Sequence, residues 1–214
     1  MNNTSRILNL CGIVAPVLFA AVIIYCGLLQ PGYSHYSQVM SVLAARGSST
    51  EWFARVGGWC VPGLLTAGFG FFLLKNVSRS KVAVSAALLV IVNGLGRFSG
   101  GVFNCDPGCQ PVDPSVSQRI HNPSTVIAYL ALGVACGLWA FSAKKIVVPR
   151  WFGWYSLTSA ILGLGFFAAL VASALMTHGG VGLFQRLSFG ILNLWILALA
   201  ILIWFSARRP DAWR

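Results

Sequence analysis

The feature that most constrains this chain is a series of apolar runs long enough to cross a membrane. A helix rises about 1.5 Å per residue, so roughly 20 mostly apolar residues cross the hydrocarbon layer of a bilayer, which is about 30 Å thick. Six segments come close to that length: 7–29, 53–74, 82–102, 124–141, 152–175 and 187–205. We therefore expect an all-α polytopic membrane protein, with six transmembrane helices in a single domain over residues 1–214.

The composition agrees with a lipid environment. Hydrophobic residues make up 57% of the chain and charged residues 9%. A water-soluble domain of this composition could not cover its surface with polar groups. The apolar part of segment 7–29 is longer than that of a cleavable signal peptide, so we expect it to remain as the first span.

The basic residues are distributed unevenly between alternate connections. Ten lie in the two tails and the connections on the same side: Arg6, Lys75, Arg79, Lys81, Lys144, Lys145, Arg150, Arg208, Arg209 and Arg214. Four lie on the other side: Arg46, Arg55, Arg119 and Arg186. This bias predicts a multi-pass protein of a prokaryotic plasma (inner) membrane with both termini in the cytoplasm. Contact with anionic membrane lipid explains the net charge of +11, and no basic stripe interleaved with aromatics indicates nucleic-acid binding.

The three external connections differ in character. In segment 30–52, Val39, Met40, Leu43 and Ala44 recur at helical spacing, which predicts a short helix lying along the membrane surface, and Gly47 could end it. Segment 103–123 contains four prolines, which favours an irregular loop. Segment 176–186 is short and rich in glycine. All three histidines and three of the four carboxylates lie on this side, so we expect any functional site to face outward.

Cys105 and Cys109 bracket a turn-forming Asp-Pro-Gly sequence. Such a turn can bring two sulfur atoms within bonding distance, and an external loop is oxidising enough to keep the bond. We therefore predict a Cys105–Cys109 disulfide.

Arg97 is the charged residue that we place inside a span. A guanidinium in lipid is costly and usually reaches the headgroups or pairs with a carboxylate, a carbonyl or a ligand anion. One alternative is that its head reaches the outer headgroups; the other is an ion pair with Asp106 or Glu51 that forms the floor of an outward pocket. The candidate ligand-binding residues of this pocket are Arg97, His35, Tyr33, Tyr36 and Glu51.

Several motifs resemble those of a known family. They are residues 31–47 (PGYSHYSQVMSVLAARG), residues 101–109 (GVFNCDPGC), His121 just before a span, and residues 185–195 (QRLSFGILNLW). Together they resemble a prokaryotic family of six-helix integral membrane proteins catalogued as domain of unknown function 998. The resemblance covers nearly the whole chain and implies the fold and the membrane location, but no activity.

Two functions remain open. In the first, the outward pocket binds a lipid or another small molecule. In the second, the protein is an intramembrane hydrolase of a lipid-like substrate, with zinc as a possible cofactor held by His35, His121 and His178. A serine, an aspartate and three histidines near one membrane face are similar to the pattern of ceramidase-like hydrolases, with Ser41 in the serine role and Asp106 or Glu51 as a base or ligand-orienting group. Those enzymes take two histidines from one helix, whereas the three histidines here are far apart in the sequence. Serine catalysis without metal, by Ser41 with His121 and Asp106, is another alternative, although no nucleophile-elbow motif is present.

Overall fold

The computed structural model describes residues 2–77, 80–142, 148–176 and 179–206, and these residues form six helices long and apolar enough to cross a membrane. The first span is α1 (Asn3–Leu29), and the second is a continuous helical stretch over Glu51–Asn76. The others are α4 (Lys81–Val102), α5 (Val116–Ser142), α6 (Trp151–Leu175) and α7 (Val181–Ser206). The prediction of an all-α, six-span protein is confirmed.

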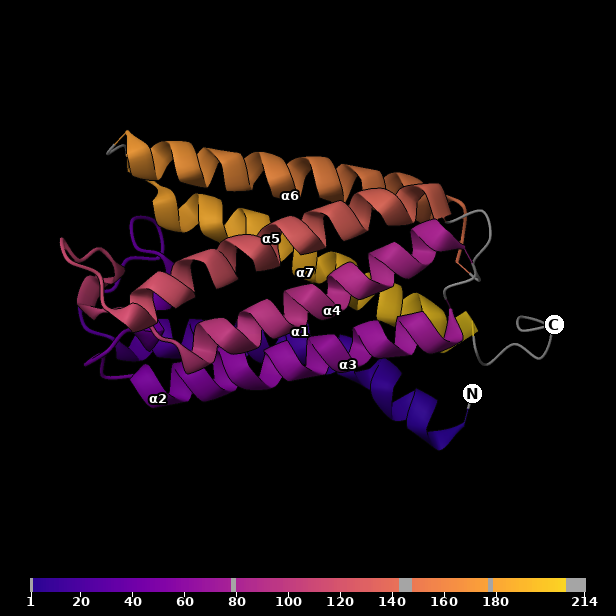
Figure 1. The fold of residues 1–214 in the computed structure, drawn as a ribbon, viewed down its shortest axis with the longest axis horizontal. Coiled ribbons are helices and arrows are strands. Elements are labelled where there is room, and N and C mark those ends of the chain that lie inside the picture. The colour runs from indigo at the N-terminus through magenta and orange to yellow at the C-terminus, as the bar shows by residue number, and fades with distance from the viewer. Residues whose placement is uncertain (1, 78–79, 143–147, 177–178, 207–214) are drawn as a thin grey trace.

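The six spans form a closed ring in the order of the chain. Each span contacts the next, and α7 returns to contact α1. Figure 1 shows the helices aligned along the long axis of the molecule, with the connections that follow α1, α4 and α6 at one end, which we call the loop end. The start of α1 and the last turn of α7 lie at the opposite end, the terminal end (Figure 1). The assignment of the terminal end to the cytoplasm stays a prediction.

The second span changes its helical winding near the loop end. It starts as α2 (Glu51–Phe53), widens into the π-helix η2 (Ala54–Cys60) and continues as α3 (Val61–Asn76). In the widened part, the Val61 N–H donates to the Val56 carbonyl five residues back. Pro62 follows directly and has no N–H to give to the ladder, so a wider turn suits this position.

Two clusters of buried apolar side chains fill the bundle. The terminal core contains the fully buried Trp139, Phe152 and Trp195, and the indole N–H of Trp195 donates to Ser156 Oγ at 2.9 Å. The loop-end core is smaller and gathers Phe19, Leu43 and Trp59 with their neighbours on α1, η1 and η2. The short 3₁₀ helix η1 (Met40–Ala44) belongs to this second cluster.

The starts of two helices and the character of the predicted surface helix differ from the sequence prediction. Helix α5 starts at Val116 and not at 124, and α7 starts at Val181 and not at 187. The additional stretch of α5 is mostly polar, whereas that of α7 is mostly apolar and ends in Gln185 and Arg186. Both are held by the loop end: the Gln118 N–H donates to Ser115 Oγ at 3.2 Å, and the Leu183 N–H donates to the Tyr36 carbonyl at 3.0 Å. The predicted surface helix is the buried 3₁₀ helix η1, because its apolar side chains pack onto the bundle instead of facing lipid.

Candidate functional site

Arg97 on α4 lies inside the bundle, with 3% of its surface exposed. Its Nη1 donates two long hydrogen bonds, to Asn193 Oδ1 at 3.3 Å and to Thr66 Oγ1 at 3.4 Å. Its Nε and Nη2 are buried and have no hydrogen-bond partner among the described residues. An unused donor on a buried cation costs free energy, so this guanidinium is poorly satisfied.

Two aromatic rings take the place of a counter-ion. The Arg97 Cζ lies 4.7 Å from the ring centroid of Phe19 on α1 and 4.8 Å from that of Phe189 on α7. The two ring centroids are 4.3 Å apart. Ring faces attract a cation, but each such contact is worth only about 2 kcal/mol when desolvated, and it leaves the positive charge in place.

The expected ion pair of Arg97 with Asp106 or Glu51 is wrong. Each of the three carboxylates in the described part of the chain is already matched with an arginine of the loop end. The pairs are Arg46–Asp106 at 3.8 Å, Arg55–Glu51 at 3.1 Å and Arg119–Asp113 at 3.5 Å. The fourth carboxylate of the sequence, Asp211, lies outside the described residues. Arg97 and Arg186 therefore have no carboxylate partner among the residues that the structure describes.

A cavity of about 20 Å³, which we call the inner cavity, adjoins Arg97. Its polar lining is Ser41, Arg97, His121, Thr125, Tyr129 and Gln185. The buried hydroxyl of Tyr129 has no hydrogen-bond partner within the described chain. The volume suffices for about one water molecule. Unpaired donors of two side chains thus share a small enclosed space.

His121 has a defined tautomer. Its Nδ1 lies 2.9 Å from the Gly100 carbonyl oxygen and 2.8 Å from that of Phe103. Carbonyl oxygens only accept hydrogen bonds, so Nδ1 carries the proton and Nε2 keeps a lone pair. His121 can therefore accept a proton or a hydrogen bond through Nε2.

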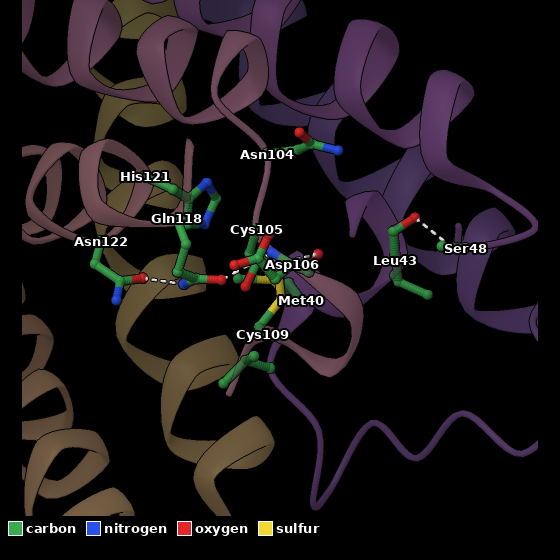
Figure 2. Close-up of a disulfide and its surroundings, with 12 residues drawn as sticks. Met40, Leu43, Ser48, Asn104, Cys105, Asp106, Cys109, Gln118, His121 and Asn122 are labelled. Carbon is green, nitrogen blue, oxygen red and sulfur yellow. Dashed lines mark hydrogen bonds between the residues drawn. A yellow bond between two sulfur atoms is a disulfide. The ribbon is translucent and has the colours of Figure 1, made fainter. Parts of the chain in front are cut away.

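Asp106 anchors the loop between α4 and α5 (Figure 2). Its N–H donates to Gln118 Oε1 at 2.9 Å, and its Oδ2 accepts from the Ser115 N–H at 2.8 Å. The hydrogen bonds from Ser115, together with the charge of Arg46, hold the pKa of Asp106 below its usual value against the opposing effect of burial. Asp106 is thus an ionised group that orders the loop.

The structure joins Cys105 and Cys109 in the predicted disulfide, with their Cα atoms 5.1 Å apart (Figure 2). The sulfur of Cys105 lies 3.4 Å from the carbonyl oxygen of Ser41. The bridge therefore sits directly against η1, which supplies Met40 and Ser41 to the inner cavity.

The residues predicted for catalysis are only partly brought together. Ser41 and His121 line the same cavity. Among the hydrogen bonds of the described residues, none joins Ser41 to His121 or His121 to Asp106. A connected Ser-His-Asp relay is therefore not formed in this structure.

The two predicted zinc ligands that the structure describes, His35 and His121, do not share a site. The described residues contain no group of three His, Cys, Asp or Glu side chains that could hold a metal ion. His178, the third predicted ligand, lies outside the described residues. His35 lines a different hollow from His121. The zinc site stays a prediction.

This second hollow, the outer groove, has a volume of about 420 Å³ and lies between α1 and α7. Its lining is apolar except for His35, Arg186 and Asn193. Phe19, Met40 and Phe189 line both the outer groove and the inner cavity, so these three side chains form the wall between them.

Arg186 fixes the loop at the loop-end mouth of the outer groove. Its Nε donates to His35 Nδ1 at 3.1 Å, and its Nη1 donates to the His35 carbonyl at 2.7 Å and the Gln38 carbonyl at 3.0 Å. Its Nη2 donates to the Tyr33 hydroxyl. Burial and then the charge of Arg186 lower the pKa of His35, whereas burial raises the pKa of Tyr33 against the effect of Arg186.

Two further predicted ligand-binding residues lie apart from both hollows. Tyr36 is 59% exposed. Glu51 accepts from the Gly47 N–H at 2.8 Å and pairs with Arg55, which makes it a loop-ordering residue. The residues that sequence reasoning missed are Phe19, Tyr129, Gln185, Arg186 and Phe189. A signal existed for three of them, since Gln185, Arg186 and Phe189 lie in one of the motifs that resemble the family.

The comparison with protein families assigns most of the chain to one family. The model of the family described as "Protein of unknown function (DUF998)" matches residues 13–202, which is most of the chain. No curated protein and no solved structure matches the chain. With six membrane-length helices and a family match across nearly all of them, the chain belongs to the DUF998 family of membrane proteins.

Proposed function

We propose that the protein binds the anionic group of a lipid or another small molecule at Arg97. One observation carries this proposal: a fully buried guanidinium has two nitrogens without acceptors and no carboxylate partner in the described chain. A bound carboxylate or phosphate would accept from Nε and Nη2 together, in the forked geometry that guanidinium groups favour.

The other polar groups of the inner cavity suit the same ligand. The Tyr129 hydroxyl can donate to an anion, and it is unpaired in this structure. Gln185 Oε1 accepts from the Met40 N–H, and its amide N–H groups can only donate. His121 Nε2 can accept from a ligand hydroxyl. The cavity thus offers donors for an anion beside one acceptor for a neutral group.

The ligand would enter by displacing part of the wall. The inner cavity as it stands holds little more than one water molecule. Met40 is an unbranched side chain that adapts its shape readily, and Phe19 and Phe189 face the much larger outer groove. Movement of these side chains would join the two hollows and extend the site toward the lipid.

Mass spectrometry of molecules that co-purify with the protein tests this function. We expect wild-type protein to retain an acidic amphiphile or metabolite that is lost in Arg97→Gln and partly kept in Arg97→Lys. The matched control is Arg119→Gln, which removes the same charge from an exposed ion pair. Equal retention by Arg97→Gln and wild type would contradict the proposal.

A second candidate is hydrolysis of a lipid-like ester or amide. The observation in its favour is that Ser41 and His121 line one cavity and that His121 presents an unprotonated Nε2. Zinc could supply a metal-activated water if His178 completes the predicted ligand set. The variant Ser41→Ala separates the two candidates. If the protein only binds a ligand, Ser41→Ala should still retain it; if the protein is a hydrolase, Ser41→Ala should lose turnover of a fatty-acid ester. Metal analysis of His121→Ala tests the zinc-dependent form of the hydrolase.

A further inference from the structure

We infer that the outer groove holds one anionic phospholipid, with an acyl chain between α1 and α7 and the headgroup phosphate at Arg186. This site is separate from Arg97, so either proposal can fail alone. Two features of the groove together identify a phospholipid as its occupant. They are an apolar channel of defined length and a cation at one end of that channel.

The length of the groove matches one leaflet. Its lining along α7 runs from Arg186 to Leu197, a helical rise of about 16 Å. Half of a hydrocarbon layer of about 30 Å is about 15 Å. The volume of about 420 Å³ falls within the range of small-molecule sites. A single acyl chain that starts at the headgroup level would end near the bilayer midplane.

The groove is open toward lipid. Val17 and Ile24 on one rim and Leu194 on the other are exposed, with 54%, 58% and 57% of their surfaces free. Below the groove the two helices close, because Asn9 Nδ2 donates to the Ala200 carbonyl at 3.1 Å. A chain can therefore enter sideways from the bilayer, and the groove has a defined inner end.

The charge at the mouth favours an anion. Arg186 donates to carbonyls, a hydroxyl and an imidazole, all of them neutral, and has no carboxylate partner among the described residues. The other loop-end arginines, Arg46, Arg55 and Arg119, each have one. An unneutralised guanidinium at headgroup depth is the group that binds lipid phosphate. Free phosphate would leave the apolar channel empty, so the lipid is the better occupant.

Two glycines provide a matched test of the channel. A side chain added at Gly190, which lines the outer groove, would meet nothing within 4 Å and would project into free space. A side chain added at Gly165 on α6 would also meet nothing within 4 Å, but Gly165 is not part of this groove. Gly190→Phe therefore fills the groove, and Gly165→Phe adds the same bulk elsewhere.

The measurement is native mass spectrometry of the full chain released from nanodiscs of equal phosphatidylglycerol and phosphatidylcholine. We expect wild type, Gly165→Phe and Arg119→Gln to carry one phosphatidylglycerol in preference to phosphatidylcholine. Gly190→Phe and Arg186→Gln should reduce that lipid-bound fraction at least fivefold. The Gly190 and Gly165 variants keep the test valid if Arg186→Gln fails to fold.

Three results would overturn the inference. The first is an unchanged phosphatidylglycerol fraction in Gly190→Phe, and the second is equal loss in Gly165→Phe. The third is equal binding of the two lipids by wild type, because Arg186 would then not select an anionic headgroup. If wild type is a dimer that Gly190→Phe dissociates without a change in lipid binding, the groove is an interface between two copies and not a lipid site.

Discussion

The two ends of the bundle are built for different purposes. At the terminal end, Trp139, Phe152 and Trp195 are fully buried and packed together in the larger core. At the loop end, the smaller core borders a cavity and the outer groove, and Arg97 with its unused donors lies against Phe19 of this core. The Trp139 indole N–H in the terminal core is also without a partner among the described residues, but it lies among packed side chains, whereas the unused donors of Arg97 adjoin a cavity. The comparison teaches that the terminal end stabilises the fold and the loop end offers its groups to a ligand.

The strongest test of this difference between the two ends is to truncate a central side chain of the terminal core. Trp195→Ala should lower the free energy of unfolding by about 3 to 5 kcal/mol, because a large buried ring leaves a cavity. Denaturant unfolding in a fixed detergent measures this. Trp154→Ala is the control, since Trp154 is 75% exposed on α6 and should cost far less. Similar losses in both variants would refute the assigned role of the terminal core.

The loop end should depend on its covalent link. Replacing both Cys105 and Cys109 by serine should cost about 2 kcal/mol, the value expected for opening a loop of about five residues. The same unfolding measurement applies, and treatment of wild type with a reductant should reproduce the loss. If the intact protein reacts with a thiol reagent at Cys105 and Cys109 before reduction, the disulfide is not formed.

Arg97 should lower the stability of the folded protein, so its replacement by an uncharged residue should raise the free energy of unfolding. Arg97→Met has similar length and no buried charge, so we expect the free energy of unfolding to rise by about 1 kcal/mol or more while ligand binding is lost. Unfolding and ligand retention are measured on the same preparation. A clear loss of stability in Arg97→Met would make Arg97 a structural pin of the loop end and remove the contrast between the two ends.

The smallest expected effect is that of pH at the mouth of the outer groove. His35 has a lowered pKa in the folded protein, so the unfolded chain binds the proton more readily. The contribution of His35 is therefore complete above about pH 6.5 and declines as the pH falls below that value. Protonation also ends the hydrogen bond from Arg186 Nε to His35 Nδ1. The protection of amides around His35 against hydrogen exchange, relative to the intrinsic exchange rate at the same pH, should fall at pH 5.5 in wild type. The same pH-dependent fall in His35→Asn would contradict this.

Apolar length predicted the spans well and their loop-end boundaries poorly. Lipid-facing segments must be apolar, so their number could be read directly. The first turns of α5 are polar and pack beneath loops, so hydropathy carries no signal for them. The start of α7 is more apolar, but the glycines at 179, 180 and 182 favoured a turn over a helix. For the same reason, Gln185 and Arg186 were placed in a connection when they belong to α7.

The partner of Arg97 could not be predicted because it depends on which carboxylates are already engaged. Asp106 and Glu51 were reasonable choices by their side of the membrane. In the structure, Asp106 pairs with Arg46 through a contact between two loops that no local pattern encodes. Glu51 pairs with Arg55 four residues further along the same helical stretch, a spacing that the sequence does show. The predicted disulfide was easier, since four residues of chain and a turn determine it.

The closure of the ring between α1 and α7 has a consequence for biogenesis. The walls of the outer groove come from the first and last spans described, so during synthesis every intervening helix must insert before the groove exists. In the nascent protein, Phe19 and its neighbours on α1 would therefore be uncovered until α7 has inserted. The ligand could bind in the groove only after all six spans are assembled.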